Sequence, residues 1–379
     1  MRTQNRTLIF VANTDWYLFN FRLNLIRAAR DAGWQPILAC SAGQYVTRLR
    51  SEGFEVVTLP LENSHINPWH EFQALYQLTR LFRARRPAVI HLFTLKCVLY
   101  GCLVSISSRH TKVLGAITGM GTLFTTASLK TRALRRTFLT VARIAFRCSG
   151  VHLIFQNDAD RDEVISHNLV KRERTSVIRG SGVDCERFKP TARGPNTALR
   201  VMFCARLLRE KGIHEYCAAV ASARDRGYAL ESWVAGERYA GNPSSLSDTE
   251  VTAIAAQDHT LLGHREDMAA VLDDVDIVML PTYYREGTPK SLLEAAAAGK
   301  LIITTDIPGC RGIVEQGVSG FIVPVKDSHA LAVALITALE MPADERARMG
   351  RAARNTALQN FSDEVVIRKT LTLYDGCIS

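Results

Sequence analysis

Hydrophobic and polar residues follow two alternating patterns along the chain. Short apolar runs rich in β-branched residues are typical of buried strands, and the segments between them have the spacing of helices with one apolar face. In the first half, the expected strands are 8–12, 36–39, 55–59, 89–92, 112–117, 151–155 and 176–178. The expected helices of this half are 23–32, 45–51, 68–83, 98–105, 132–147 and 160–167.

The pattern starts again in the second half, after a segment at 191–197 whose Gly, Pro and Asn residues indicate a linker. Strands are expected at 199–204, 230–236, near 260, 276–280, 301–304 and within 317–324, with helices at 289–299 and 362–374. Alternating strands and helices predict a parallel, doubly wound sheet in each half. Ligands of such sheets bind at the carboxyl ends of the strands.

The stretch 281–294 combines several signals of a binding loop. Pro281 ends an apolar strand, and the next residues are polar, aromatic or glycine. Thr288 and Pro289 form a predicted helix start, with a capping hydroxyl followed by proline at the first helical position. A helix N-terminus presents free amides to an anion. Glu286 and Glu294 are therefore expected to bracket a ligand whose phosphate meets this helix end.

A glutamate, seven residues and a second glutamate, set in Glu-Gly-Thr-Pro-Lys-Ser-Leu-Leu-Glu, resembles the signature of family 4 glycosyltransferases of the GT-B class. The resemblance implies two Rossmann-like doubly wound domains that face a central cleft. The expected domains are 1–185, joined by the terminal helix 360–379, and 196–359. The segment 180–184 resembles the interdomain loop of the family, with Ser181 in place of the usual asparagine.

A second element of the family lies after the strand 199–204, where Arg206 and Lys211-Gly212 resemble its arginine-x-x-x-x-lysine-glycine sequence. Two fixed cations stabilise the charge that builds up on a departing nucleoside diphosphate. Arg206, Lys211 and Glu286 are expected to act in catalysis. The residues expected to bind the donor are Arg206, Lys211, Arg265, Glu286, Gly287, Thr288, Pro289, Lys290 and Glu294.

The resemblance implies a UDP-sugar donor, retention at the anomeric carbon, and no cofactor or metal ion, because the two cations neutralise the diphosphate. Asp274-Val-Asp276 spells a metal-binding signature of another glycosyltransferase class. It lies directly before a buried strand, so we interpret these aspartates as caps. The nine cysteines include no Cys-x-x-Cys pair, which favours reduced thiols over a metal cluster.

The first half carries the features expected to bind an acceptor. The segments 13–22, 91–96 and 118–121 resemble the subgroup that extends polyprenyl-diphosphate-linked sugars, including bacterial N-acetylgalactosaminyltransferases. Thr118 and Gly119 stand where many relatives have a histidine, so no catalytic histidine is assigned. His91 either lines the site as a polar residue or is a core residue whose hydrogen bonds are satisfied. Lys96 either contacts an acceptor phosphate or faces solvent. The expected acceptor-binding residues are Asn13, Asn20, Arg22, His91, Lys96, Thr118 and Gly119.

The formal net charge of +10 adds an expectation about partners. Basic residues cluster at 80–86 and 130–147, and in the second cluster they alternate with apolar residues as in a basic amphipathic helix. Such helices bind anionic membrane surfaces or phosphates. No motif for nucleic acid accompanies them. We expect a cytoplasmic protein, peripheral on the inner face of the cell membrane, with no apolar run long enough to span it.

Three functions are therefore compatible with these patterns. The first is transfer of a sugar, expected to be an N-acetylhexosamine, from a UDP-sugar to a polyprenyl-diphosphate-linked saccharide. The second is a glycosyltransferase with a soluble acceptor, and the third is a UDP-sugar epimerase of GT-B fold. A binding subunit without activity is disfavoured because Arg206, Lys211, Glu286 and Glu294 are all present.

Overall fold

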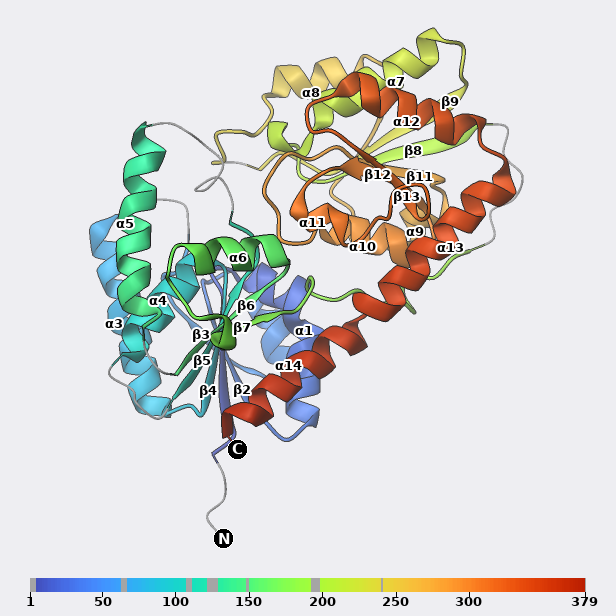
Figure 1. Ribbon diagram of the computed structural model, residues 1–379. Helices are drawn as coiled ribbons and strands as arrows, with labels where there is room; N and C mark the ends of the chain where they lie inside the picture. Colours follow the sequence, from blue (N-terminus) through green and yellow to red (C-terminus); the bar gives the residue numbers. More distant parts are fainter. Residues whose placement is uncertain are drawn as a thin grey trace. The chain divides into compact units, whose positions relative to one another are not determined.

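The computed structural model describes residues 5–62, 67–106, 111–120, 129–147, 150–191, 198–239 and 241–378. The chain forms two compact units (Figure 1). Unit 1 comprises Met1–Gly182, Glu286–Thr288 and Asp363–Ser379, and unit 2 comprises Val183–Arg285 and Pro289–Ser362. Most of the predicted linker, residues 192–197, lies outside the described residues, as does Gly121.

Unit 1 contains a parallel sheet of seven strands in the order β3-β2-β1-β4-β5-β6-β7. Its order reverses between β1 and β4, because the chain first builds outward from β1 in one direction and then in the other. The strands are β1 (Thr7–Val11), β2 (Gln35–Cys40), β3 (Glu55–Thr58), β4 (Val89–Phe93), β5 (Lys112–Ile117), β6 (Val151–Phe155) and β7 (Thr175–Val177).

Helices cover both faces of this sheet, and each face has its own apolar cluster. Helices α3, α4, α5 and α6 pack on one face, while α1, α2 and α14 pack on the other (Figure 1). Their bounds are α1 (Asp15–Asp31), α2 (Val46–Ser51), α3 (Pro68–Arg85), α4 (Leu95–Ser105), α5 (Leu129–Ala145), α6 (Asp158–Ser166) and α14 (Asp363–Ile378).

Unit 2 contains a parallel sheet of six strands in the order β10-β9-β8-β11-β12-β13. The strands are β8 (Leu199–Cys204), β9 (Leu230–Ala235), β10 (Thr260–Gly263), β11 (Ile277–Leu280), β12 (Leu301–Thr305) and β13 (Gly320–Val323). The helices are α7 (Ile213–Asp225), α8 (Asp248–Ala255), α9 (Met268–Asp273), α10 (Lys290–Ala297), α11 (Pro308–Arg311), α12 (Ser328–Glu340) and α13 (Ala343–Asn360).

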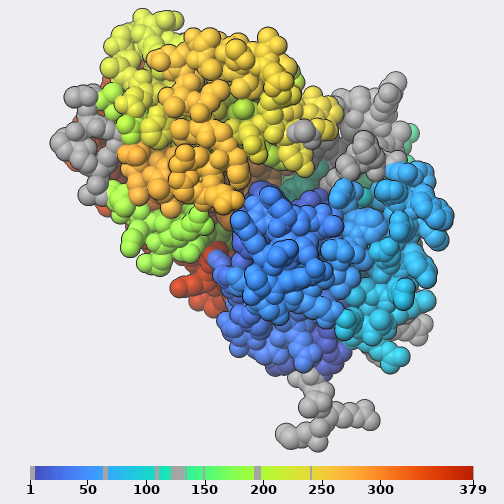
Figure 2. Space-filling view, turned by 180° about the vertical axis from the view of Figure 1, so that it is seen from behind, coloured from blue at the N-terminus to red at the C-terminus, as the bar shows by residue number. Residues whose placement is uncertain are grey.

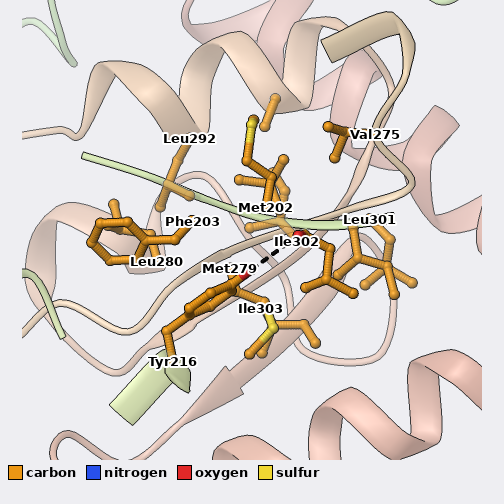
Figure 3. Packing of buried hydrophobic residues seen from close by; sticks show 14 of the residues in the cluster. Met202, Phe203, Tyr216, Val275, Met279, Leu280, Leu292, Leu301, Ile302 and Ile303 are labelled. Atoms are coloured by element: carbon orange, nitrogen blue, oxygen red, sulfur yellow. Dashed lines mark hydrogen bonds between the residues drawn. The ribbon is translucent and has the colours of Figure 1, made fainter. Parts of the chain in front are cut away.

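The core of unit 2 is one continuous apolar cluster around the central strands β8, β11 and β12 (Figure 3). Tyr216 from α7 is fully buried in it. Its hydroxyl is hydrogen-bonded to the carbonyl oxygen of Val201 at 2.9 Å and to the hydroxyl of Ser232 at 2.8 Å. A buried hydroxyl needs such partners, so this tyrosine ties α7 to two neighbouring strands.

The doubly wound architecture is as predicted, and several helix starts differ from the prediction, those of α1 and α10 among them. Helix α1 begins at Asp15 rather than at residue 23, because Thr14 caps the Tyr17 amide and Asp15 binds the amides of Tyr45 and Val46. Helix α10 begins at Lys290 with Pro289 as its N-cap residue. The prediction that Thr288 caps this helix was therefore wrong.

Candidate functional site

The sheet of unit 2 changes direction between β8 and β11, which are hydrogen-bonded neighbours. In an open parallel sheet, the two loops that leave such a pair of strands run in opposite directions and open a crevice at their carboxyl ends. The loop after β8 contains Arg206 and Lys211, and the loop after β11 leads to Lys290 and Glu294. The sequence therefore places four predicted donor-binding residues at this edge of the sheet.

Arg206 and Lys211 differ in their surroundings. Arg206 is exposed, and its guanidinium carbon lies 4.9 Å from the centre of the Tyr239 ring. Lys211 is only 6% exposed, and its Nζ lies 5.3 Å from the centre of the Tyr284 ring. A lysine is rarely buried to this degree unless its charge is paired.

The backbone between these two cations holds the loop after β11 in place. The Glu210 carbonyl oxygen accepts hydrogen bonds from the amides of Tyr283 and Tyr284 at 2.9 and 3.1 Å, and from the Thr282 hydroxyl at 3.1 Å. Gly212 has a φ of +83°, and a Cβ atom at this position would overlap the Pro281 carbonyl. The glycine of the arginine-lysine-glycine element is thus required both by its backbone conformation and by the close approach of another chain segment.

Helix α10 supplies Lys290 in its first turn and Glu294 one turn later, on the same side of the helix. Burial raises the pKa of the Glu294 carboxyl, while the positive charges of Lys290 and Arg187 act in the opposite direction. By surface area, Glu294 is partly buried on this side of the helix. Glu286, which precedes α10, is partly exposed, and Glu286–Thr288 group with unit 1.

Arg265 and the Asp274-Val-Asp276 sequence have structural partners. Arg265 is exposed and forms two hydrogen bonds with Asp267, at 2.7 and 2.5 Å. Asp276 accepts a hydrogen bond from the backbone amide of Arg200, and Asp274 forms an ion pair with the guanidinium of Arg200. Asp274 is also the C-cap residue of α9. Across the described ranges, no three histidine, cysteine or acidic residues group as metal ligands would.

Unit 1 has a corresponding change of direction between β1 and β4. Asn13 follows β1 and Thr94 follows β4, so both lie at the carboxyl edge of the central strands. Thr94 has φ +69° and ψ 149°, a backbone conformation that is costly for a β-branched residue. Such strain persists where the surrounding structure enforces it, and it is concentrated at functional sites.

His91 lies in the middle of β4 and is 2% exposed. Its Nδ1 atom is hydrogen-bonded to the Tyr374 hydroxyl of α14 at 2.6 Å, while its buried Nε2 atom has no partner. Burial and the nearby charge of Arg22 hold the pKa of His91 well below its usual range, so the imidazole is neutral. His91 is therefore in part a satisfied core residue, through Nδ1, and in part a polar lining residue, through Nε2.

Arg22 on α1 is a buried cation close to His91. It is 5% exposed, its Nη2 donates to the Tyr17 hydroxyl at 2.8 Å, and its guanidinium lies 4.5 Å from the centre of the Phe93 ring. Arg22 and His91, together with Gln156 and Thr370, line a cavity of about 20 Å³. Ala116, Ile154 and Ile178 also line it, so the cavity is of mixed character, with room for about one water molecule or one small ligand group.

The other predicted acceptor residues are more scattered. Asn20 is exposed on α1 and donates to the carbonyl oxygen of Trp16 at 3.0 Å. Lys96 forms an ion pair with Glu71 at 3.0 Å and donates to the carbonyl oxygen of Glu62 at 2.8 Å. Lys96 therefore ties α4 to α3 and its preceding loop. Thr118 and Gly119 directly follow β5, at the carboxyl edge of the sheet.

Several residues at these sites were not singled out in the sequence. Tyr17, Gln156 and Tyr374 surround Arg22 and His91, and Tyr239 and Tyr284 flank the two cations of unit 2. Gln156 directly follows a predicted strand, so its position was a usable signal. Tyr374 comes from a helix nearly three hundred residues further along the chain than His91, and no local pattern reveals that contact.

Comparison with known proteins agrees with this architecture. Residues 7–158 match the family model described as "Glycosyl transferase 4-like", and residues 198–341 match "Glycosyl transferases group 1". The chain is therefore a glycosyltransferase with the GT-B fold. It belongs to the family 4 glycosyltransferases, as the two family models, one in each half, together show.

One curated relative is the N,N'-diacetylbacillosaminyl-diphospho-undecaprenol alpha-1,3-N-acetylgalactosaminyltransferase of Campylobacter jejuni. It is 24% identical over 383 residues, which cover 97% of this chain and 98% of the relative. Another is the capsular polysaccharide biosynthesis glycosyltransferase CapM of Staphylococcus aureus. It is 22% identical over 346 residues, covering 86% of this chain and 88% of the relative.

Two solved structures resemble the whole chain. A glycosyltransferase of Rickettsia africae gives a TM-score of 0.79 at 16% identity, with 100% of both chains covered. HepE of Anabaena in complex with UDP gives a TM-score of 0.78 at 19% identity, covering 98% of this chain and 100% of that one. At these identities, the likeness shows the fold alone.

Proposed function

We propose that the protein transfers an N-acetylhexosamine from a UDP-sugar to a polyprenyl-diphosphate-linked saccharide, with retention at the anomeric carbon. The observation that carries this proposal is the likeness to the Campylobacter jejuni transferase over nearly the full length of both chains. That relative acts on a diphospho-undecaprenol acceptor according to its name. The UDP bound to HepE supports the choice of UDP as the nucleotide of the donor.

The donor diphosphate binds in unit 2, between the two loops at the change of direction of the sheet. Arg206 and Lys211 pair with its phosphate oxygens, and Lys290 and the free amides of α10 face the same charge. Glu294 accepts hydrogen bonds from the ribose hydroxyls. Arg265 and its neighbours lie in the loop after β10, where the uracil binds.

In the transfer step, the bond between the anomeric carbon and the UDP oxygen breaks while the acceptor hydroxyl attacks on the same face of the sugar. The electron pair of the broken bond stays with UDP, and a phosphate oxygen of UDP takes the proton of the acceptor hydroxyl. Glu286 positions the sugar and stabilises positive charge at the anomeric carbon. Arg206 and Lys211 stabilise the growing charge of the diphosphate, so this step uses no metal ion.

On the acceptor side, the proposal assigns Asn13, Thr118 and Gly119 to the carboxyl edge of the unit 1 sheet. Arg22 and the unpartnered Nε2 of His91 lie beside the small cavity near this edge. Asn20 and Lys96 are also proposed to contact the acceptor, but fewer observations support them. Asn20 bonds to its own helix, and Lys96 already pairs with Glu71.

The test is UDP release by the purified protein across a panel of UDP-sugars, each with and without a polyprenyl-diphosphate-linked monosaccharide. We expect release that requires one UDP-N-acetylhexosamine together with the lipid-linked acceptor, that persists in EDTA, and that fails in Glu286→Ala. Release with a water-soluble acceptor instead would overturn the lipid acceptor. Conversion of a UDP-sugar to its epimer without UDP release would overturn transfer altogether.

Matched variants of the loop after β8 test the role of its cations. Lys211→Met and Arg206→Met are each expected to lower kcat by about 100- to 1,000-fold, the cost of losing one group that stabilises transition-state charge. Arg209→Met is the control, because Arg209 lies in the same loop and forms an ion pair with Glu250 at 2.7 Å. Equal losses in all three variants would show that the loop is merely sensitive to substitution.

A further inference from the structure

The helix layer α3-α4-α5 of unit 1 carries an unusual surface. Helices α3 and α5 both pack against α4, and together they cover one face of the sheet (Figure 1). Among the described residues, the three most exposed large apolar side chains all lie on α3. They are Trp69 at 70%, Phe72 at 61% and Tyr76 at 60%. Exposed apolar groups gathered in this way mark an interaction surface.

The three aromatic residues form a stripe along α3. Their spacing of three and four residues places them on one side of the helix, over about 10 Å of its length. The rings of Trp69 and Phe72 are stacked with their centres 6.0 Å apart. The stripe is continued by the exposed residues Arg80 and Arg83. The outer side of α3, part of the light-blue surface in Figure 2, is therefore aromatic at its start and basic at its end.

Charge around the stripe is mainly positive, although Arg85 and Arg135 form ion pairs with Glu55 and Glu163 of neighbouring elements. The three helices contain nine lysine or arginine residues, three in α3, one in α4 and five in α5, against a single acidic residue, Glu71. Glu71 itself is engaged by Lys96 and by the Tyr100 hydroxyl at 2.6 Å. A partner of this layer must therefore be anionic and must also accept aromatic side chains.

Helix α5 by itself does not provide both properties. Several of its described apolar side chains are used internally, because Ala142 and Ala145 are buried and Phe138 and Leu139 pack against the core of unit 1, whereas Ile144 is 55% exposed. Its outer side presents arginines, among them the exposed Arg136 and Arg143. The predicted basic amphipathic helix thus exists, but the described apolar residues of α5 other than Ile144 mostly pack against unit 1. Most of the apolar part of a membrane contact must therefore come from a neighbouring element.

We propose that the stripe Trp69, Phe72 and Tyr76 inserts into the interface of an anionic phospholipid bilayer, while the arginines of α3 and α5 contact the lipid headgroups. Tryptophan and tyrosine favour the boundary between headgroups and acyl chains, and clustered arginines bind anionic lipid. This inference rests on the proposed function only in expecting that a membrane carries the acceptor. The aromatic stripe and the charge of the layer support it independently.

The test is sedimentation with vesicles made of equal parts phosphatidylglycerol and phosphatidylcholine, without acceptor or UDP-sugar. The triple variant Trp69→Ser, Phe72→Ser, Tyr76→Ser is expected to bind at least about tenfold more weakly than the wild type. The matched control is Val318→Ser, Val333→Ser, Leu358→Ser, which removes three exposed apolar side chains from unit 2. It is expected to bind as the wild type does. Binding of the wild type should also weaken as salt is raised.

Two outcomes would overturn the proposal. One is equal vesicle binding by the wild type and the stripe variant, both being folded by circular dichroism. The other is no vesicle binding together with a dimer in solution that the stripe variant abolishes, which would make the stripe a protein interface. UDP release with a short-chain, water-soluble analogue of the acceptor should be unchanged in the stripe variant. Vesicle binding without any UDP release would instead count against the proposed function.

Discussion

At the scale of single residues, Glu294 shows how the candidate donor site affects stability. Its carboxyl lies on α10 where burial disfavours the charged form and raises its pKa above the ordinary value of 4.5. A group whose pKa is raised by folding contributes stability that is complete below its unfolded-state pKa. That contribution is lost as the pH rises through the folded-state pKa. At neutral pH, an ionised Glu294 therefore reduces the free energy of unfolding.

Replacing Glu294 with glutamine should separate stability from binding. Glu294→Gln keeps the size of the side chain and removes its charge, so we expect a higher Tm than the wild type at neutral pH and a vanishing difference below about pH 4.5. The affinity for UDP should fall at the same time, because an ionised acceptor of the ribose hydrogen bonds is lost. Calorimetry at several pH values and titration with UDP measure the two effects.

Glu250→Gln is the control with the opposite sign. Hydrogen bonds from Ser247 and from Arg209 lower the pKa of Glu250 to about 2. Its contribution to stability is present at neutral pH and is lost as the pH falls toward that value. Glu250→Gln should therefore lower Tm at neutral pH. A lower Tm for both variants would show that the argument about Glu294 is wrong.

At the scale of secondary-structure elements, the junction between β8 and α7 depends on one glycine. Gly212 is the N-cap residue of α7 and has a left-handed backbone conformation. It lies against the Pro281 carbonyl, at the end of the strand that neighbours β8. Lys211 and the loop after β11 are thereby held close together. A side chain at position 212 would push these two segments apart.

Gly212→Ala and Gly227→Ala form a matched pair for this junction. Both glycines have similar φ angles, +83° and +88°, but a Cβ atom at Gly227 would meet nothing within 4 Å. Gly227→Ala should therefore cost only the backbone strain, about 1 kcal/mol. Gly212→Ala adds the overlap with Pro281 and should cost about 2 to 4 kcal/mol, with weaker UDP binding. Urea denaturation measures both, and equal losses would remove the steric argument.

Most elements of both sheets were predictable, because buried parallel strands are apolar along their whole length. The start of α1 was not, since residues 15–22 mix aromatic and polar side chains and the helix start depends on a contact between Asp15 and the amides of Tyr45 and Val46. Helices α7, α8, α9, α12 and α13 were also not predicted. Nine of the thirteen residues of α12 are alanine, leucine, valine or isoleucine, so its apolar face is not distinct from the rest of the helix.

The candidate sites divide in the same way. Arg206, Lys211 and Glu294 could be proposed from the sequence because the elements that carry them have local sequence signals. Arg22 and His91 were named, but the buried pairing of His91 with Tyr374 depends on a distant helix. The roles of Arg265 and Lys96 cannot be read from sequence either, since each depends on which acidic residue lies nearby in the fold.

At the scale of the whole molecule, each unit has its own core and its own change of strand direction. The donor site proposed above uses mainly residues of unit 2. UDP alone should therefore stabilise one part of the chain more than the other. Binding to the folded state stabilises by about 2.7 kcal/mol when the ligand is at a hundredfold excess over its Kd.

Hydrogen exchange with and without UDP tests this difference between the units. We expect slower exchange in 204–213 and 289–294, where the cations and the start of α10 lie, and no change in β2 and β3 of unit 1. Lys211→Met should abolish the protection at equal UDP concentration. Protection confined to unit 1 would contradict the assignment of the donor site.

The return of α14 to unit 1 affects the order in which the two units can finish folding. Val366 and Tyr374 complete the core on one face of the unit 1 sheet, yet the ribosome produces them after all of unit 2. During translation, that face of the sheet and the ring of His91 therefore stay exposed until α14 has been synthesised. Chaperones are therefore expected to bind the exposed apolar face of the nascent first unit. The core of this unit is completed only after α14 has been synthesised.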